Sequence, residues 1–482
     1  MNCLKRIGLV LILTLSFGGI AFSADDAAVL LEEAIYAEEI LGDADEAARI
    51  YRLIADSAES GRAASPQALY RLGRYYEGRG RGEDAIATFT RLAKQYPEQK
   101  ELVLRIPTLT GAQQIIPQFL PAPWEDGEML TYSANGINRT HVAESISKNG
   151  KKTWKLLSIS AYGNSMDYSA IWATADTFTP VEMWDWQDLN TGSTISYLPN
   201  SGIISRKSGT EKLLNEVRLP MTVYDSKQII YLLRCLPLQM GFETTIPIFN
   251  SSNDSISVRR ISVEDRESIV TPAGTFNAWK VAYGNKGAET FYWISDDSHR
   301  YPVKMAQSPI AQHVLILASI SKYEKNRPVE YEDQNISFSL PPGWFCLTVR
   351  ENTERSDGER WSFISFSDPE FETYSNITFV EYASGKDAQL LLSENVDWLL
   401  GINPSGFNFL LRPGSMENIT VSGLPGARFI FDRKPDVGND IQYNFVVSTG
   451  DNVARVYLRT HKDNFDRVKP VFDSIIESIR LR

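Results

Sequence analysis

The feature that most constrains this fold is a series of short β-strand patterns that fills residues 125–325. Ser, Thr, Tyr, Trp and Ile become frequent there, and turns recur about every ten residues, as in large antiparallel sheets and partly closed barrels. The alternation is clear in one segment, in which four residues share a face: Trp154, Leu156, Ser158 and Ser160. We therefore predict a large antiparallel β half-barrel, whose last strand before an interruption is Ile203–Lys207.

One helix interrupts this series. Asp225 can cap the segment Ser226–Cys235, and Gln228 stands at the reciprocal position of a capping box. The segment is apolar nearly all round, which is typical of a buried helix. We predict that it packs against the sheet, as a plug in the half-barrel.

Residues 25–105 have a helical pattern rich in Ala, Leu, Glu and Arg, with breaks that contain Gly or Asp. Four helices are expected: Ala27–Leu41, Asp45–Ser57, Pro66–Glu77 and Gly82–Gln95. Asp43 is a natural N-cap for the second of them. Four prolines between residues 106 and 124 then indicate a stiff linker before the β region.

The second pair of helices has small and apolar residues at the spacing of a tetratricopeptide repeat. These residues are Leu69, Leu72, Gly73, Tyr76, Ala85, Phe89, Leu92 and Pro97. The helical region resembles two such repeats, in which small Gly73 and Ala85 let the paired helices approach. The resemblance implies a protein-binding groove lined by the first helix of each pair: Val29, Glu32, Tyr36, Glu39, Gln67, Tyr70, Arg74 and Glu77. The alternative is that these residues are solvated helix faces.

Three sequence segments of the β region are the most characteristic of a particular family. They are YDSKQIIYLLRCLPLQMGF, VTPAGTFNAWKV and FYWISDDSHRYPVKM. Through them, residues 124–325 resemble an exported bacterial family of unknown function known as DUF3108. The resemblance implies a β-rich envelope domain without known catalysis. We also expect some similarity to the half-open barrel of periplasmic lipoprotein carriers.

The aromatic residues of this region allow two interpretations. They could line an apolar cavity for a lipid or another apolar ligand, or they could form an ordinary core. The candidates for the cavity are Trp184, Trp186, Trp279, Tyr292 and Trp293.

The best polar cluster of the β region is Asp296, Asp297, His299 and Arg300. Two carboxylates beside a histidine could bind a metal or transfer protons. A turn whose aspartates accept hydrogen bonds from its own backbone is the simpler interpretation. We therefore predict no catalytic residue, no metal site and no cofactor.

Residues 326–482 have the pattern of an α/β sandwich. The opening ISFSLPPGW, the turn and strand GLPGARFIF, and a late strand followed by an amphipathic terminal helix resemble the PsbP/Mog1 type of domain. That family implies protein–protein or accessory roles. The whole chain is thus expected to be multidomain α+β, with helical repeat hairpins, the half-barrel with its buried helix, and the sandwich.

The first 24 residues have the three parts of a signal peptide, with an apolar run over Ile7–Phe17. We expect an exported protein of the bacterial periplasm with no transmembrane span after cleavage; an uncleaved anchor is the alternative. A net charge of −11 disfavours nucleic acid as a partner. Cys235 and Cys346 are either bridged or, as we favour, two free thiols.

Together these patterns predict an exported, non-enzymatic binding or scaffold protein of the cell envelope, which acts on a protein or peptide partner. The first alternative is a carrier of an apolar ligand or lipid in the central β domain. The second is an enzyme with an unrecognised site near Asp297 and His299.

Overall fold

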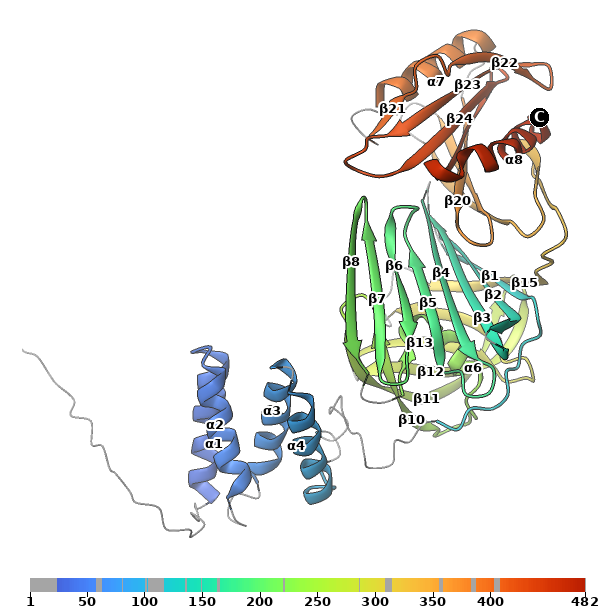
Figure 1. The fold of residues 1–482 in the computed structure, drawn as a ribbon. Helices are drawn as coiled ribbons and strands as arrows, with labels where there is room; N and C mark the ends of the chain where they lie inside the picture. Colours follow the sequence, from blue (N-terminus) through green and yellow to red (C-terminus); the bar gives the residue numbers. More distant parts are fainter. Residues whose placement is uncertain are drawn as a thin grey trace, which may run out of the picture. The chain divides into compact units, whose positions relative to one another are not determined.

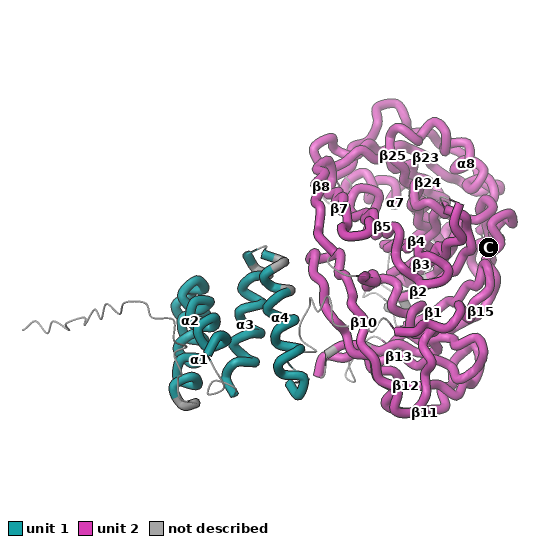
Figure 2. Tube along the Cα trace, turned by 60° about the horizontal axis from the view of Figure 1, so that its bottom comes forward, with its two compact units in different colours: residues 1–115 teal, residues 116–482 magenta. Residues whose placement is uncertain are grey.

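The computed structural model describes residues 24–57, 63–79, 81–99, 102, 117–134, 137–148, 150–162, 165–219, 222–285, 287–307, 314–354, 359–382, 387–402 and 408–481. The predicted signal peptide, apart from Ala24, lies outside these residues, and so do residues 106–116 of the predicted linker. The chain divides into two compact units, residues 1–115 and residues 116–482 (Figure 2).

The first unit is helical, as predicted. Its helices are α1 (Ala24–Glu39), α2 (Ala44–Asp56), α3 (Ser65–Gly78) and α4 (Gly82–Gln95) (Figure 1). Asp43 caps α2 by accepting a hydrogen bond from the Glu46 amide at 3.0 Å. The helices share a core that includes Tyr51 and Phe89. A Cβ atom on Gly73 would lie 2.3 Å from the Phe89 ring, so the close approach of α3 and α4 requires glycine there.

The second unit contains one large antiparallel sheet, which confirms the predicted architecture. Its strands are β1 (Glu128–Ala134), β2 (Ile137–Lys148), β3 (Lys151–Tyr162), β4 (Ser165–Thr174), β5 (Pro180–Trp186), β6 (Thr191–Tyr197), β7 (Ser201–Ser208), β8 (Glu211–Arg218), β9 (Tyr224–Asp225), β10 (Glu243–Asn250), β11 (Ser255–Thr271), β12 (Gly274–Asn285), β13 (Ala288–Ser295), β14 (Pro302–Gln307) and β15 (Val314–Lys322). In the described part of the chain they form a 15-stranded sheet in the order β8-β7-β6-β5-β4-β3-β2-β1-β15-β14-β13-β12-β11-β10-β9. Only the β9–β10 pair in this order is parallel. The sequence did not predict β8, because its residues are almost all exposed and no apolar alternation marks them.

The sheet curls until strands from its two ends come together. The Tyr197 hydroxyl of β6 donates a hydrogen bond to the Asp225 carboxylate of β9. Arg206 of β7 pairs with Asp254 in the turn between β10 and β11. Apolar residues of β4–β7 and β10 share one core cluster. Figure 1 shows β2–β8 on one side of the curl and β10–β13 on the other.

The predicted buried helix lies inside this curl. It begins as the 3-10 turn η2 (Ser226–Gln228) and continues as α6 (Ile229–Arg234). Asp225 and Gln228 form the expected capping box. Every residue of α6 is buried, and its apolar side chains pack among the inward residues of the sheet. The prediction of a capped helix that fills the half-barrel is therefore confirmed.

Residues 329–481 form two further sheets and two longer helices. The smaller sheet has the order β16 (Val329–Glu332), β17 (Ile336–Leu340) and β26 (Arg480–Leu481). The larger has the order β18 (Phe345–Glu354), β19 (Arg360–Ser367), β20 (Thr373–Glu381), β25 (Asn452–His461), β24 (Asp440–Ser448), β23 (Leu424–Arg433) and β21 (Phe409–Leu411), and β22 (Glu417–Val421) also pairs with β23. Helix α7 (Ala388–Ile402) packs on β23 and β24. Helix α8 (Phe465–Ser478) follows the 3-10 turn η4 (Lys462–Asn464) and buries its apolar face in the core of these sheets.

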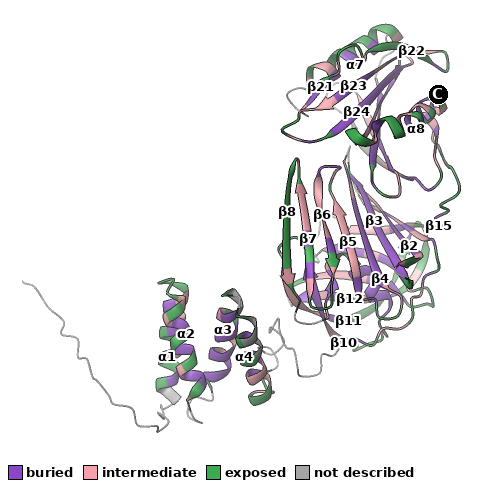
Figure 3. Ribbon diagram, viewed as in Figure 1, coloured by how far each residue is buried: buried purple, intermediate pink, exposed green. Residues whose placement is uncertain are grey.

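Strands β2–β4 are buried on both faces over much of their length, and the neighbouring β5 is partly buried. Their inward face meets α6, and their outward face packs against β18–β20 through one shared cluster. Tyr168 stacks on Phe371 with ring centroids 5.1 Å apart and donates a hydrogen bond to the Pro369 carbonyl at 3.0 Å. Two-sided contact explains why β3 and β4 are buried along most of their length (Figure 3).

Among the described residues, no helix is long and apolar enough to span a membrane.

Cys235 and Cys346 are free thiols, as the sequence favoured. Burial raises the pKa of each thiol to about 12. Because the thiolate is the reactive form, the raised pKa disfavours reaction of either thiol near neutral pH.

Candidate functional site

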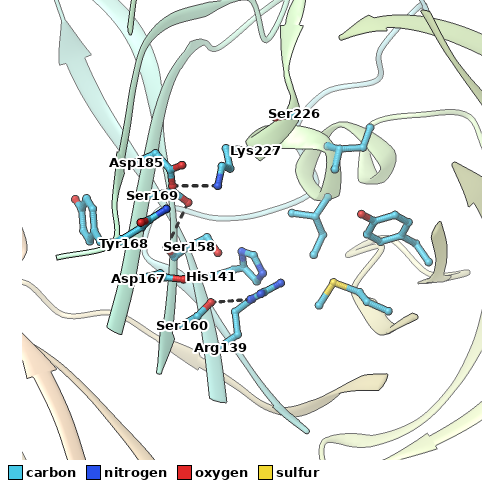
Figure 4. A pocket seen from close by; sticks show the side chains of 15 residues that line it. Arg139, His141, Ser158, Ser160, Asp167, Tyr168, Ser169, Asp185, Ser226 and Lys227 are labelled. Atoms are coloured by element: carbon cyan, nitrogen blue, oxygen red, sulfur yellow. Dashed lines mark hydrogen bonds and ion pairs between the residues drawn. The ribbon is translucent and has the colours of Figure 1, made fainter. Parts of the chain in front are cut away.

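A cavity of about 360 Å³ lies on the inward face of β2–β5 (Figure 4). Polar residues line it in two rows that cross neighbouring strands. The strand registers give the first row as His141, Ser158, Ser169 and Asp185. They give the second row as Arg139, Ser160 and Asp167. Since side chains alternate between faces along a strand, these residues all point into the curl.

The other wall of the cavity is largely apolar. It consists of side chains from α6, β13 and β14: Ile229, Ile230, Tyr292 and Met305. Lys227 and Gln187 also line the cavity and are exposed, whereas His141 is only 6% exposed. The cavity therefore extends from the surface into the interior.

The carboxylates of the cavity have partners. Lys227 forms an ion pair with Asp185 at 3.0 Å. The Tyr162 hydroxyl donates a hydrogen bond to Asp167 at 2.9 Å. Burial raises the pKa of Asp167, because a charged carboxylate loses solvation inside the curl.

Arg139 and His141 keep hydrogen-bonding capacity that the described residues do not use. Arg139 donates from Nε to Ser160 Oγ at 2.8 Å, and its terminal nitrogens have no other partner in the part of the chain that the structure describes. Neither ring nitrogen of His141 has a hydrogen-bond partner of normal geometry there. Burial, and then the charges of Arg139 and Arg234, lower the pKa of His141 to about 3, while the Leu157 carbonyl opposes this. The imidazole is therefore neutral near pH 7 and offers one donor and one acceptor.

The aromatic residues predicted to line an apolar cavity lie in two separate places: Trp184 and Trp186 on β5, and Trp279, Tyr292 and Trp293 on β12 and β13. The β5 pair belongs to the outward cluster, because Asp185 between them points into the cavity. The other three belong to or pack against the core cluster around α6, but Tyr292 and Trp293 are successive residues of β13 and point to opposite faces of the sheet. Of the five, only Tyr292 lines the cavity, which is mostly polar.

The Asp-Asp turn after β13 forms structural contacts. Asp297 accepts hydrogen bonds from the backbone amides of His299 and Arg300 at 2.8 and 2.9 Å, which is the predicted turn. Asp296 forms an ion pair with Arg266 at 2.7 Å. Among the described residues, no group of three or more His, Cys, Asp or Glu side chains could hold a metal ion.

The predicted partner groove lies on α1 and α3. Its exposed members are Val29, Glu32, Tyr36, Glu39 and Arg74, whereas Gln67 and Tyr70 are half-buried. The side chain of Glu77 lies outside the described ones. Arg71 of α3 forms ion pairs with Glu38 and Glu39 of α1 at 2.7 and 2.8 Å, so the two helices present neighbouring faces.

The large sheet, its capped helix and the Asp-Asp turn fall in a stretch of the chain that matches a known family. Residues 131–310 match the family described as "Protein of unknown function (DUF3108)". This DUF3108 segment contains both polar rows of the cavity. Residues 67–98 match a tetratricopeptide repeat. Both predicted resemblances are confirmed for these residues.

Several solved structures are similar to parts of the chain. PsbP from Synechocystis sp. PCC 6803 is 17% identical over 33% of this chain and 94% of its own, with a TM-score of 0.27. LpqN, involved in cell envelope biogenesis of Mycobacterium tuberculosis, is 14% identical over 32% of this chain and 89% of its own, with a TM-score of 0.23. MucB, solved in complex with MucA(peri), is 9% identical over 74% of this chain and 92% of its own, with a TM-score of 0.16. No curated protein matches the sequence.

The polar cavity was not predicted from the sequence, although the chain contains a signal for it. Four successive strands have polar residues two positions apart: Arg139 and His141, Ser158 and Ser160, Asp167 and Ser169, Asp185 and Gln187. Such pairs form one patch only if the strands are neighbours in the right register. The spacing of these residues can be read from the sequence, but only the strand registers show that they form one patch.

Proposed function

We propose that the protein is a non-enzymatic binding or scaffold protein of the bacterial cell envelope, and that its helical unit takes a segment of a partner protein. The supporting observation is the exposed face of α1. Val29 and Tyr36 lie two turns apart on it and are 56% and 55% exposed. Tyrosine is enriched among the residues that dominate binding energy, so Tyr36 is the expected anchor.

The charges around this pair define the partner segment. Glu32 and Glu39 lie on the same face of α1 and are exposed. Glu39 also pairs with Arg71, so Glu32 is the carboxylate that favours a segment with an apolar side chain next to Lys or Arg, since opposite charges guide the encounter and set the register. A short amphipathic helix presents such residues on one face.

Two further parts of this proposal rest on separate observations. The periplasmic location rests on the signal-peptide pattern of the first 24 residues. The lack of catalysis rests on the Asp-Asp turn, because backbone amides and Arg266 engage the two carboxylates that were the best acid–base candidates.

Site-specific photo-crosslinking in cells tests the proposal. A photoreactive phenylalanine replaces Tyr36 in one chain and Leu410, which is 46% exposed in the second unit, in another. We expect one partner to crosslink from position 36 and not from position 410. A peptide spanning the crosslinked segment should then bind the chain, and Tyr36→Ala should weaken binding about thirty-fold, or roughly 2 kcal/mol, as for an anchor residue.

Leu410→Ala is the matched control and should leave the peptide affinity unchanged. Equal crosslinking from both positions, or equal peptide affinity of the Tyr36→Ala and unchanged chains, would show that this face of α1 is only solvated.

A further inference from the structure

We propose that the polar cavity of the DUF3108 segment binds a small amphipathic carboxylate, with Arg139 as the residue that holds the carboxylate group. This site lies in the second unit and is independent of the peptide-binding face on α1. The cavity volume of about 360 Å³ falls within the usual range of small-molecule sites, roughly 300–1,000 Å³.

The guanidinium of Arg139 supplies the charge for this ligand. Ser160 fixes the group through Nε at 2.8 Å, which leaves its terminal nitrogens without a partner among the described residues. Two parallel N–H donors match the two oxygens of a carboxylate. Arg139 also differs from Lys227, the other cation of the cavity, because Lys227 is already paired with Asp185.

His141 and the hydroxyl groups extend the polar wall beside Arg139. His141 is the next inward residue along β2, and the registers place it opposite Ser158 as they place Arg139 opposite Ser160. A buried imidazole with two unpartnered nitrogens is costly unless a ligand or water satisfies them. Both ring nitrogens are covered by neighbouring side chains, with Tyr132 and Tyr231 packed edge-on against the imidazole, so the polar groups of this wall that a ligand can reach are Arg139 and the serine hydroxyls.

The remaining charges favour a carboxylate over a phosphate. Asp167 and Asp185 also line the cavity, so a doubly charged anion would meet two like charges. The charge of Arg139 is partly offset by Asp167, with which it interacts electrostatically. Its terminal N–H groups nevertheless lack an acceptor among the described residues, and a carboxylate supplies two oxygen acceptors with a single negative charge.

The other wall accounts for the apolar body of the ligand. Ile229, Ile230 and Met305 come from α6 and β14, and their side chains pack in the inward core. A ligand whose carboxylate meets Arg139 therefore places the rest of its surface against aliphatic side chains. Burial of that apolar surface adds to binding.

Calorimetric titration of the full chain with four probes tests the proposal. Sodium octanoate has both the carboxylate group and the apolar chain that the proposal requires. 1-Octanol lacks the charge, sodium acetate lacks the apolar chain, and inorganic phosphate is the alternative anion. We expect saturable one-site binding of octanoate and at least tenfold weaker binding of the other three. Octanol or phosphate binding as tightly as octanoate, or no binding of any probe, would overturn the proposal.

Arg139→Gln should weaken octanoate binding at least tenfold. The matched control is Arg266→Gln, which removes an exposed arginine of β11 outside the cavity and should leave octanoate binding unchanged. Equal loss in both variants, or no loss in Arg139→Gln, would exclude Arg139 as the carboxylate ligand. If Arg139→Gln does not fold, the comparison of the four probes on the unchanged chain decides the outcome.

Discussion

The guanidinium of Arg234, at the end of α6, forms a two-pronged ion pair with the Glu128 carboxylate of β1, at 2.6 and 3.1 Å. Arg234 is 1% exposed and also donates hydrogen bonds to the His299 and Arg300 carbonyls at 2.7 and 3.0 Å. Arg300 in turn donates from its own guanidinium to the Arg234 carbonyl. One buried arginine thus joins the plug helix, the first strand and the Asp-Asp turn.

This contact gives a structural role to two of the three family-specific sequence segments. Arg234 lies in one of these segments and His299 and Arg300 in another, 65 and 66 positions further along the chain, yet they meet in the structure. Asp297 accepts hydrogen bonds from the His299 and Arg300 amides and so fixes the shape of the turn. In this turn the carbonyls of His299 and Arg300 point at the Arg234 guanidinium. The residues that most resembled an active site therefore build the fold.

Arg234→Met should destabilise the second unit by about 3–5 kcal/mol, because it leaves Glu128 and two carbonyls buried without their partner. All ten tryptophans of the chain lie in residues 116–482, so a urea titration followed by tryptophan fluorescence reports on this unit. The control is Arg266→Met, whose ion pair with Asp296 is exposed and should cost less than about 1 kcal/mol. Similar losses in the two variants would contradict the structural role of Arg234.

His141→Gln should make the second unit less sensitive to acid. The ordinary pKa of histidine is 6.5, and burial lowers the pKa of His141 to about 3 in the folded chain. Between these values the unfolded chain binds one more proton, so the stability from neutral His141 is present above pH 6.5 and is lost as the pH falls. Between about pH 7 and pH 4.5, the unchanged chain should lose roughly 2–3 kcal/mol more than His141→Gln. Parallel pH profiles would mean that His141 titrates normally.

Asp440→Asn should destabilise the packing of the large sheet against the C-terminal sheets. Asp440 is buried, accepts a hydrogen bond from Asn190 at 2.6 Å, and pairs with Arg433 and Arg459 at 2.8 Å each. Burial alone would raise its pKa, but the two guanidinium groups outweigh it and lower the pKa. We expect a loss of about 3–5 kcal/mol, since the substitution removes the buried carboxylate that the two guanidinium groups share.

Amide hydrogen exchange of β24 and β25 measures this loss. Glu417→Gln is the control, because the Glu417 carboxylate pairs with Arg428 on the surface and should contribute less than about 1 kcal/mol. Unchanged exchange in Asp440→Asn would refute the prediction.

Gly73→Ala should destabilise the helical unit by about 1–3 kcal/mol, because the new methyl group would overlap the Phe89 ring. Helix propensity alone predicts the opposite sign, a gain of roughly 1 kcal/mol. Gly401→Ala in α7 is the matched control: no atom lies within 4 Å of its Cβ position, so it should be neutral or stabilising. Segment-resolved hydrogen exchange measures the local stability of α3 and of α7 in the full chain. A more stable α3 in Gly73→Ala would contradict the prediction.

Local patterns were enough to predict much of this fold. Capping residues, helix periodicity and strand alternation depend on neighbours within a few positions, so the Asp225 cap and the faces of β3 follow from the sequence. The exposed strand β8 could not be predicted, because its residues contact little that would impose an apolar pattern. Nor could the side taken by Trp184, since an aromatic residue suits either face of a part of the sheet that is covered on both sides.

The sequence by itself determined the helical hairpins, the antiparallel sheet, the capped apolar helix and the nature of the Asp-Asp turn. Only the tertiary structure decided where function could reside. It aligned Arg139, His141 and the serines of β3 and β4 into one polar wall, and it used Arg234 to fix the turn in place. The physical reason is that a site formed across strands depends on register and curvature, which are properties of the whole sheet and not of any one segment.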